Sequence, residues 1–223
     1  MASVLEGQMV EIEDMPQEFI DEGGGRSSVA HLDLHRWRAT MIGELNASPV
    51  RPRLPLALAG LGCIHLLAFL LCQACYFPDG RADLRHPLLW FLELVGVLAF
   101  FTGVLGPGWM RSTLAMNLVV KFWTTFLILS FSAVTLNSFT GFELAWYKPI
   151  WGTLSTFLLA SMAWLFTPWF FVPAVQMWLT GLLIVNLPDY AFLIYGVSWW
   201  IALVGIAIRM RQSDLRRGIP GPD

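Results

Sequence analysis

The chain has 223 residues, of which 56% are hydrophobic and 13% are charged, and its formal net charge is −2. This composition is too apolar for an ordinary soluble domain, and it offers no basic surface with which to bind nucleic acid. We therefore expect a protein whose main partner is the lipid bilayer.

Residues 1–28 form an acidic segment. Glutamate and aspartate recur through the first 22 residues, where lysine and arginine are absent. That is the opposite of the basic start of a secretory signal peptide. The few apolar residues cannot bury enough surface to offset the entropy of ordering the chain. The sequence therefore predicts a disordered cytoplasmic tail over residues 1–28.

Residues 29–53 combine an amphipathic pattern with a basic, proline-rich end. Apolar side chains recur at spacings of three or four residues, at Leu34, Trp37, Met41 and Leu45. This periodicity predicts a short amphipathic helix. Two positions for it remain open: the membrane interface, with its arginines near anionic lipid, or the loops of the same protein. Arg51 and Arg53 then alternate with prolines that oppose helix until the first span.

Residues 54–208 are a series of apolar stretches, each close to the roughly 20 residues that a membrane-spanning helix needs. We expect spans at 54–76, 87–106, 113–136, 149–167, 169–187 and 190–208. The apolar run between residues 149 and 187 is too long for one span and is broken only by Pro168 and Pro173. A hairpin near Pro168 gives six spans, whereas a long helix followed by a re-entrant segment gives five.

Arginines gather on both flanks of this apolar region. They are Arg36, Arg38, Arg51 and Arg53 before it, and Arg209, Arg211, Arg216 and Arg217 after it. Because cytoplasmic segments are enriched in lysine and arginine, both termini are predicted to be cytoplasmic, with 209–223 as a basic tail. This favours six spans, although Arg81 and Arg85 in the first outer loop count against it. The expected fold is all-α: a multi-pass transmembrane helical bundle over residues 54–208, in the cell membrane.

Ionisable residues inside the spans are the strongest functional signal. Glu93 in the second span and Lys121 in the third are costly at membrane depth, and their backbones differ in depth by roughly 5–10 Å, which a lysine stem can bridge. With His65 and Asn117 they form a candidate intramembrane polar cluster. Two interpretations remain open: an ion pair that fixes helix packing, or a titratable cluster of the kind that proton-coupled transport uses.

The eleven tryptophans are many for this length. Most lie near predicted span ends, as expected of aromatic belts at the two interfaces: Trp90, Trp109, Trp146, Trp151, Trp169 and Trp199. Trp123, Trp164 and Trp178 lie deeper. For these three, packing in the core or against lipid is favoured over lining a ligand cavity.

The sequence does not support a catalytic or cofactor-binding motif. His31 and His35 lie four residues apart without an evident third metal ligand, and the H-E-x-x-H and G-x-S-x-G motifs are absent from the sequence. Cys72 and Cys75 form a C-x-x-C in an apolar span, where a packing role is favoured over redox chemistry. We predict no catalytic residue, metal or cofactor, and the question of enzymatic activity stays open, leaning towards none.

Three classes of function follow. A small transporter-like or channel-like bundle is the leading hypothesis. A non-catalytic membrane partner or assembly subunit, bound to another protein or to a second copy of itself, is the alternative, and a membrane-embedded enzyme is the third. A transporter should place Glu93, Lys121, His65 and Asn117 around one solvated cavity, whereas a partner subunit should keep its charges paired and dry.

Overall fold

The structure is a computed structural model that describes residues 26–75, 85–140 and 144–216. The chain forms two units, Met1–Arg36 and Trp37–Asp223. The disorder predicted for residues 1–28 lies outside the described residues, except that residues 26–28 belong to the first helix. The end of the predicted basic tail, residues 217–223, also lies outside them.

Every described element is helical. The long helices are α1 (Arg26–Ala47), α2 (Leu54–Ala74), α3 (Arg85–Leu105), α4 (Leu114–Thr140), α5 (Leu144–Leu165), α6 (Phe171–Asn186) and α7 (Ala191–Arg216). Short 3-10 turns at Arg51–Arg53, Trp109–Arg111, Pro168–Phe170 and Pro188–Tyr190 precede α2, α4, α6 and α7. The predicted all-α fold is confirmed. Helix boundaries lie close to the predicted spans, except that α4 continues to Thr140, α5 begins at Leu144 and α7 continues beyond residue 208.

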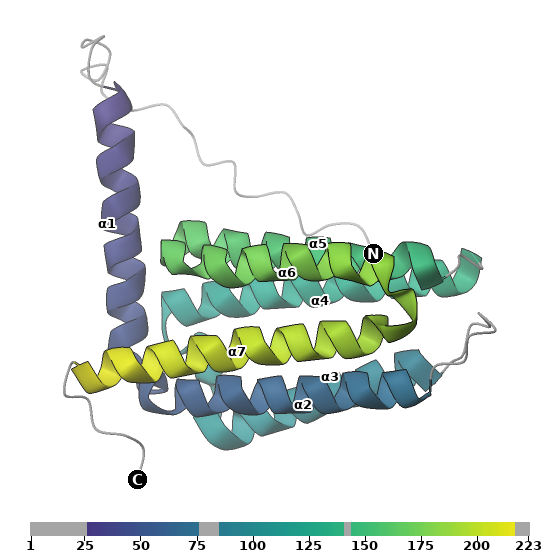
Figure 1. Ribbon diagram of the computed structural model, residues 1–223. Helices are drawn as coiled ribbons and strands as arrows, with labels where there is room; N and C mark the ends of the chain where they lie inside the picture. Colours follow the sequence, from purple (N-terminus) through teal and green to yellow (C-terminus); the bar gives the residue numbers. More distant parts are fainter. Residues whose placement is uncertain (1–25, 76–84, 141–143, 217–223) are drawn as a thin grey trace, which may run out of the picture. The chain divides into compact units, whose positions relative to one another are not determined.

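Helices α2 to α7 lie side by side with their axes roughly aligned (Figure 1). Helix α2 packs against α7 and α3, while α5 packs against α6 and α4, and α6 also contacts α7. The consecutive helices α3 and α4 therefore each have their main packing partner elsewhere. That arrangement leaves room between them for the cavity described below.

The outer faces of these helices are strongly apolar. Leu92 on α3, Trp178 on α6 and Ile201 on α7 are all exposed, and many similar side chains accompany them. Five of the described helices are long and apolar enough to cross a bilayer, and the described apolar part of α5, Pro149–Leu165, is shorter. A soluble surface does not carry so much contiguous apolar area. The protein is an integral membrane protein.

The run between residues 149 and 187 forms two packed helices. Helix α5 ends at Leu165, Thr167 is extended, and the turn Pro168–Phe170 leads into α6. The two helices approach so closely that a Cβ built on Gly152 would lie 2.5 Å from the Cα of Gly181. Small residues allow such close backbone contact in membranes. The structure therefore has the predicted hairpin and not the long helix with a re-entrant segment.

The second half of α1, from Trp37 onward, packs on the end of the bundle. Met41 is buried in the core and Leu45 packs against it. The Glu44 carboxylate accepts a hydrogen bond of 3.1 Å from the backbone N–H of Ala115, in the first turn of α4. Helix N-termini carry such unsatisfied amides, so a carboxylate there stabilises both elements. Of the two positions that the sequence allowed for this helix, residues 37–47 therefore adopt the one in which it packs on the same protein and not on the membrane interface.

Candidate intramembrane ligand site

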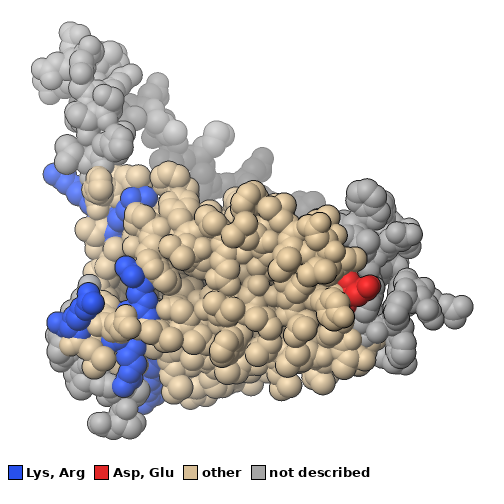
Figure 2. Space-filling model, viewed as in Figure 1, with Lys and Arg blue, Asp and Glu red and all other residues tan. Residues whose placement is uncertain are grey.

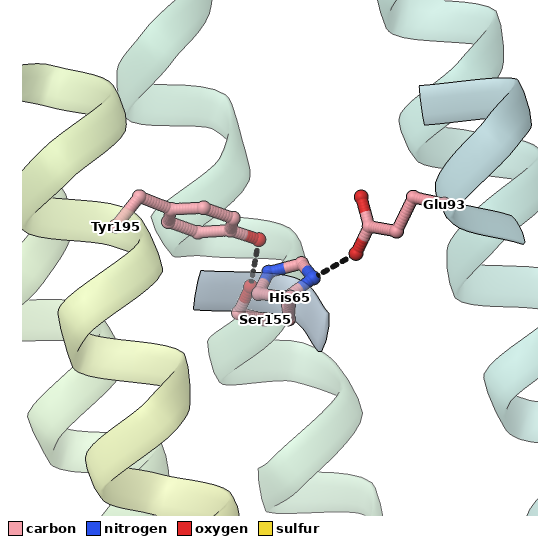
Figure 3. Close-up of polar contacts among 4 residues, drawn as sticks. All are labelled: His65, Glu93, Ser155 and Tyr195. Carbon is pink, nitrogen blue, oxygen red and sulfur yellow. Dashed lines mark hydrogen bonds and ion pairs between the residues drawn. The ribbon is translucent and has the colours of Figure 1, made fainter. Parts of the chain in front are cut away.

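The centre of the bundle holds an ion pair between a histidine and a glutamate. His65 comes from the middle of α2 and Glu93 from α3, which packs on α2. The imidazole Nδ1 contacts a carboxylate oxygen of Glu93 (Figure 3). Their side chains are 17% and 11% exposed, respectively. A charged group at this depth requires a partner, and each residue supplies one to the other.

Aromatic rings surround the imidazole. Its centroid lies 4.5 Å from that of Phe69 and 5.7 Å from that of Trp199. The Tyr195 ring lies 6.0 Å away, and its hydroxyl forms a 2.7 Å hydrogen bond with the buried hydroxyl of Ser155. In the view of Figure 3, Glu93 lies on one side of the imidazole and the Tyr195–Ser155 pair on the other. The His65–Glu93 pair therefore lies in an aromatic, largely dry environment.

A cavity of about 100 Å³ opens beside this ion pair, and we call it the inner cavity. Its walls come from α2, α3, α4, α5 and α7, and they include four tryptophans: Trp90, Trp123, Trp151 and Trp199. Glu93 is the only carboxylate among its described lining residues, which hold no lysine or arginine. The volume suffices for several waters or one small ligand.

Four buried polar atoms of residues that line the inner cavity have no hydrogen-bond partner among the described residues. They are the Nε2 of His65, the Oγ of Ser130 and the indole Nε1 atoms of Trp90 and Trp199. Buried polar groups in native proteins are nearly always satisfied, by protein, water or ligand. The inner cavity therefore offers hydrogen-bonding positions that a bound molecule can satisfy.

A second cavity of about 480 Å³, the basal cavity, lies toward the end of the bundle where α2 begins and α7 ends. Trp123, Trp199 and Leu203 line both cavities, so these side chains form the border between them. The two tryptophan rings meet edge to face with centroids 5.5 Å apart. The basal cavity has arginines in its walls, and Figure 2 shows the Lys and Arg side chains gathered at one end of the described surface.

Lys121 and Asn117 are not part of the inner cavity. Lys121 is exposed on α4 and lines neither cavity. It lies two residues before Trp123, so at 100° per residue it faces nearly the opposite way. The amide of Asn117 lies 3.5 Å from the backbone carbonyl of Met110, near the start of α4. Of the four predicted cluster residues, the structure brings together His65 and Glu93 alone. The single cavity lined by all four residues that was expected of a transporter is therefore not found, and the pairing of Glu93 with His65 matches the expectation for a partner subunit.

Sequence reasoning missed most of the aromatic wall. Trp151 and Trp199, assigned to the interfacial belts, are only 3% and 1% exposed and belong to the core. Trp164 and Trp178 are exposed on the outer faces, which agrees with the predicted packing against lipid, whereas Trp123 lines both cavities. One signal was present: the site residues recur four apart on their helices, as in the pairs His65/Phe69, Trp151/Ser155 and Tyr195/Trp199.

Metal chemistry finds no site in the described part of the chain. Among those residues, no group of three histidine, cysteine, aspartate or glutamate side chains could hold a metal ion. The three cysteines are free thiols, with Cys72 buried and Cys63 exposed. No family model, curated protein or solved structure matches the chain. Evidence for a function therefore comes from the chemistry of the site itself.

Proposed function

We propose that the protein is a transporter-like membrane protein that binds a small organic cation in the inner cavity and exchanges it for a proton on the His65–Glu93 pair. The observation that carries this proposal is the single carboxylate of Glu93 in a cavity walled by four tryptophans. A buried carboxylate attracts a cation strongly, because little water screens it. Tryptophan faces add cation–π attraction, which is greatest for desolvated ammonium groups.

Histidine is the partner that makes exchange possible. An arginine beside Glu93 would hold its charge permanently, whereas imidazole releases its proton near neutral pH. The bound cation replaces the imidazolium as the partner of the carboxylate. One proton leaves His65 for the solvent as one cation binds, so the net charge of the site does not change. The freed imidazole stays neutral and keeps its place on α2.

The border between the two cavities favours a transporter over an open channel. Trp123 and Trp199 are in van der Waals contact where a continuous pore would have to pass. Passage from one cavity to the other requires these rings to move. Such a step, alternating with access from the other side, is the behaviour of a transporter.

Calorimetric titration of the purified full chain in neutral detergent tests binding, with tetramethylammonium as the probe. We expect the wild type to bind it and Glu93→Gln to bind at least about tenfold more weakly, which corresponds to roughly 1.4 kcal/mol. Asp189→Asn is the matched control, since it removes an exposed carboxylate outside both cavities. We expect its affinity to equal that of the wild type.

Two results would overturn the proposal. One is equal affinity in the wild type and a folded Glu93→Gln variant. The other is tighter binding of a small anion such as acetate than of tetramethylammonium. Either would leave His65–Glu93 as a packing contact and favour the alternative of a non-catalytic assembly subunit.

We also propose that the arginine end of the bundle faces the cytoplasm, with both termini there. The start of α2 and the end of α7 lie at one end of the bundle, because Arg51 and Asp214 form an ion pair of 2.9 Å. Arginine-rich ends remain on the cytoplasmic side during insertion. Reporter fusions that are active only in the cytoplasm should work at both termini, and a silent fusion at either one would contradict this orientation.

A further inference from the structure

The basal cavity combines an apolar interior with a basic mouth. Its deep walls are apolar side chains from four helices, among them Leu58, Met116, Leu158 and Ile206. Its volume of about 480 Å³ lies in the range of cavities that bind organic ligands. The occupant must therefore bury an apolar portion of substantial size.

The mouth of the basal cavity carries exposed positive charge. Arg209 and Arg216, both on the last turns of α7, line it and are exposed. Arg209 lies over the Trp169 ring, with 4.8 Å from its guanidinium carbon to the ring centroid. Asp214, the only carboxylate on these turns, is already engaged by Arg51. The charge that complements this mouth is negative.

Neutral donors stand beside the arginines. Gln212, Ser213 and Thr167 also line the basal cavity. A phosphate diester presents several acceptor oxygens, and guanidinium groups bind such oxygens with paired N–H donors. The mouth lies at the arginine end of the bundle, where the headgroups of one leaflet are expected.

We infer that the basal cavity is a binding site for an anionic phospholipid, with one acyl chain among the apolar walls and the phosphate at Arg209 and Arg216. A zwitterionic lipid brings its own cation to the mouth and is disfavoured there. Free inorganic phosphate fills the mouth alone and leaves the apolar walls uncovered. The site is separate from His65–Glu93 and does not depend on the function proposed for that pair.

Native mass spectrometry of the full chain, titrated with phosphatidylglycerol or phosphatidylcholine in one neutral detergent, measures the two affinities. We expect phosphatidylglycerol to bind the wild type at least tenfold more tightly. The double variant Arg209→Gln/Arg216→Gln should lose at least about tenfold in phosphatidylglycerol affinity, because both guanidinium groups lose their charge-assisted hydrogen bonds to the phosphate.

The matched control is Arg111→Gln/Arg211→Gln. It removes two exposed arginines that do not line the basal cavity. We expect its phosphatidylglycerol affinity to stay within about threefold of the wild type. Equal losses in the two double variants would show a diffuse surface charge effect and would overturn the site.

A further variant tests the apolar part of the site. Met210 is half-buried and lines the cavity, so Met210→Trp fills space while keeping every arginine. We expect it to weaken phosphatidylglycerol binding while its melting temperature in lipid-free detergent stays close to that of the wild type. Glycerol phosphate, the headgroup without chains, should not compete with the lipid. Unchanged lipid affinity in Met210→Trp, or full competition by glycerol phosphate, would overturn the chain-in-cavity arrangement.

Discussion

The inner and basal cavities share three lining side chains, Trp123, Trp199 and Leu203, yet the charged groups that line them differ in kind. The inner cavity holds one carboxylate and one histidine, and the basal cavity has fixed arginine charges. Histidine can lose its charge near neutral pH, whereas arginine cannot. The bundle thus keeps a histidine–carboxylate pair deep inside, and keeps arginine charges at the end where α2 begins and α7 ends.

The largest effect is expected at the basal cavity, where Arg51 and Asp214 form a buried ion pair. Asp214→Leu removes the carboxylate that pairs with Arg51 and should cost about 3–5 kcal/mol of stability. Arg51→Met should have a similar cost. The double variant should be much less destabilised, because no charge is then stranded. Denaturant or thermal unfolding of the detergent-solubilised variants measures this cycle, and losses that simply add would show that the pair contributes no coupling.

The next largest effect concerns the border between the cavities. Trp199 is 1% exposed and packs against both Trp123 and His65. Trp199→Leu joins the two cavities and should destabilise the protein by about 2–4 kcal/mol through lost packing. The same variant should allow a proton leak across proteoliposomes that the wild type resists. Intact proton impermeability in a folded Trp199→Leu variant would contradict the role of this ring as the border.

A smaller effect on stability is expected at the inner cavity. Glu93→Gln keeps the shape of the side chain and a carbonyl oxygen that can accept a hydrogen bond from His65. Its stability should therefore change by only about 1 kcal/mol, although cation binding weakens by at least about tenfold. Thermal unfolding measures the first quantity and calorimetry the second. A loss as large as that of Asp214→Leu would show that the pair mainly holds the helices together.

The smallest effect is expected for Lys121, which the sequence paired with Glu93. Because Lys121 is exposed and lies on another face of α4, Lys121→Gln should leave the melting temperature unchanged within error. Combined with Glu93→Gln, its effect should be additive. Strong non-additivity between these two variants would restore the predicted Glu93–Lys121 pair.

The fold was predictable because its signals are local. Apolar length, proline and glycine mark each helix, and the Pro168 turn separated α5 from α6 as expected. The partner of Glu93 was not predictable from the sequence, because it depends on which helices pack against each other. Glu93 was predicted to pair with Lys121 because the two residues lie on consecutive spans. Helix α3 packs on α2 instead, so His65 and not Lys121 contacts the Glu93 carboxylate. Arg51–Asp214 was missed for the same reason, since no local pattern joins the start of α2 to the end of α7.

Proton release on cation binding tests the central proposal most directly. Tetramethylammonium is added to the weakly buffered protein in detergent, and a pH-sensitive dye follows the solution between about pH 5 and 8. We expect release of up to about one proton per bound cation in the wild type, and none in Glu93→Gln or His65→Gln. Cation binding to the wild type without proton release anywhere in this range would contradict exchange at His65–Glu93.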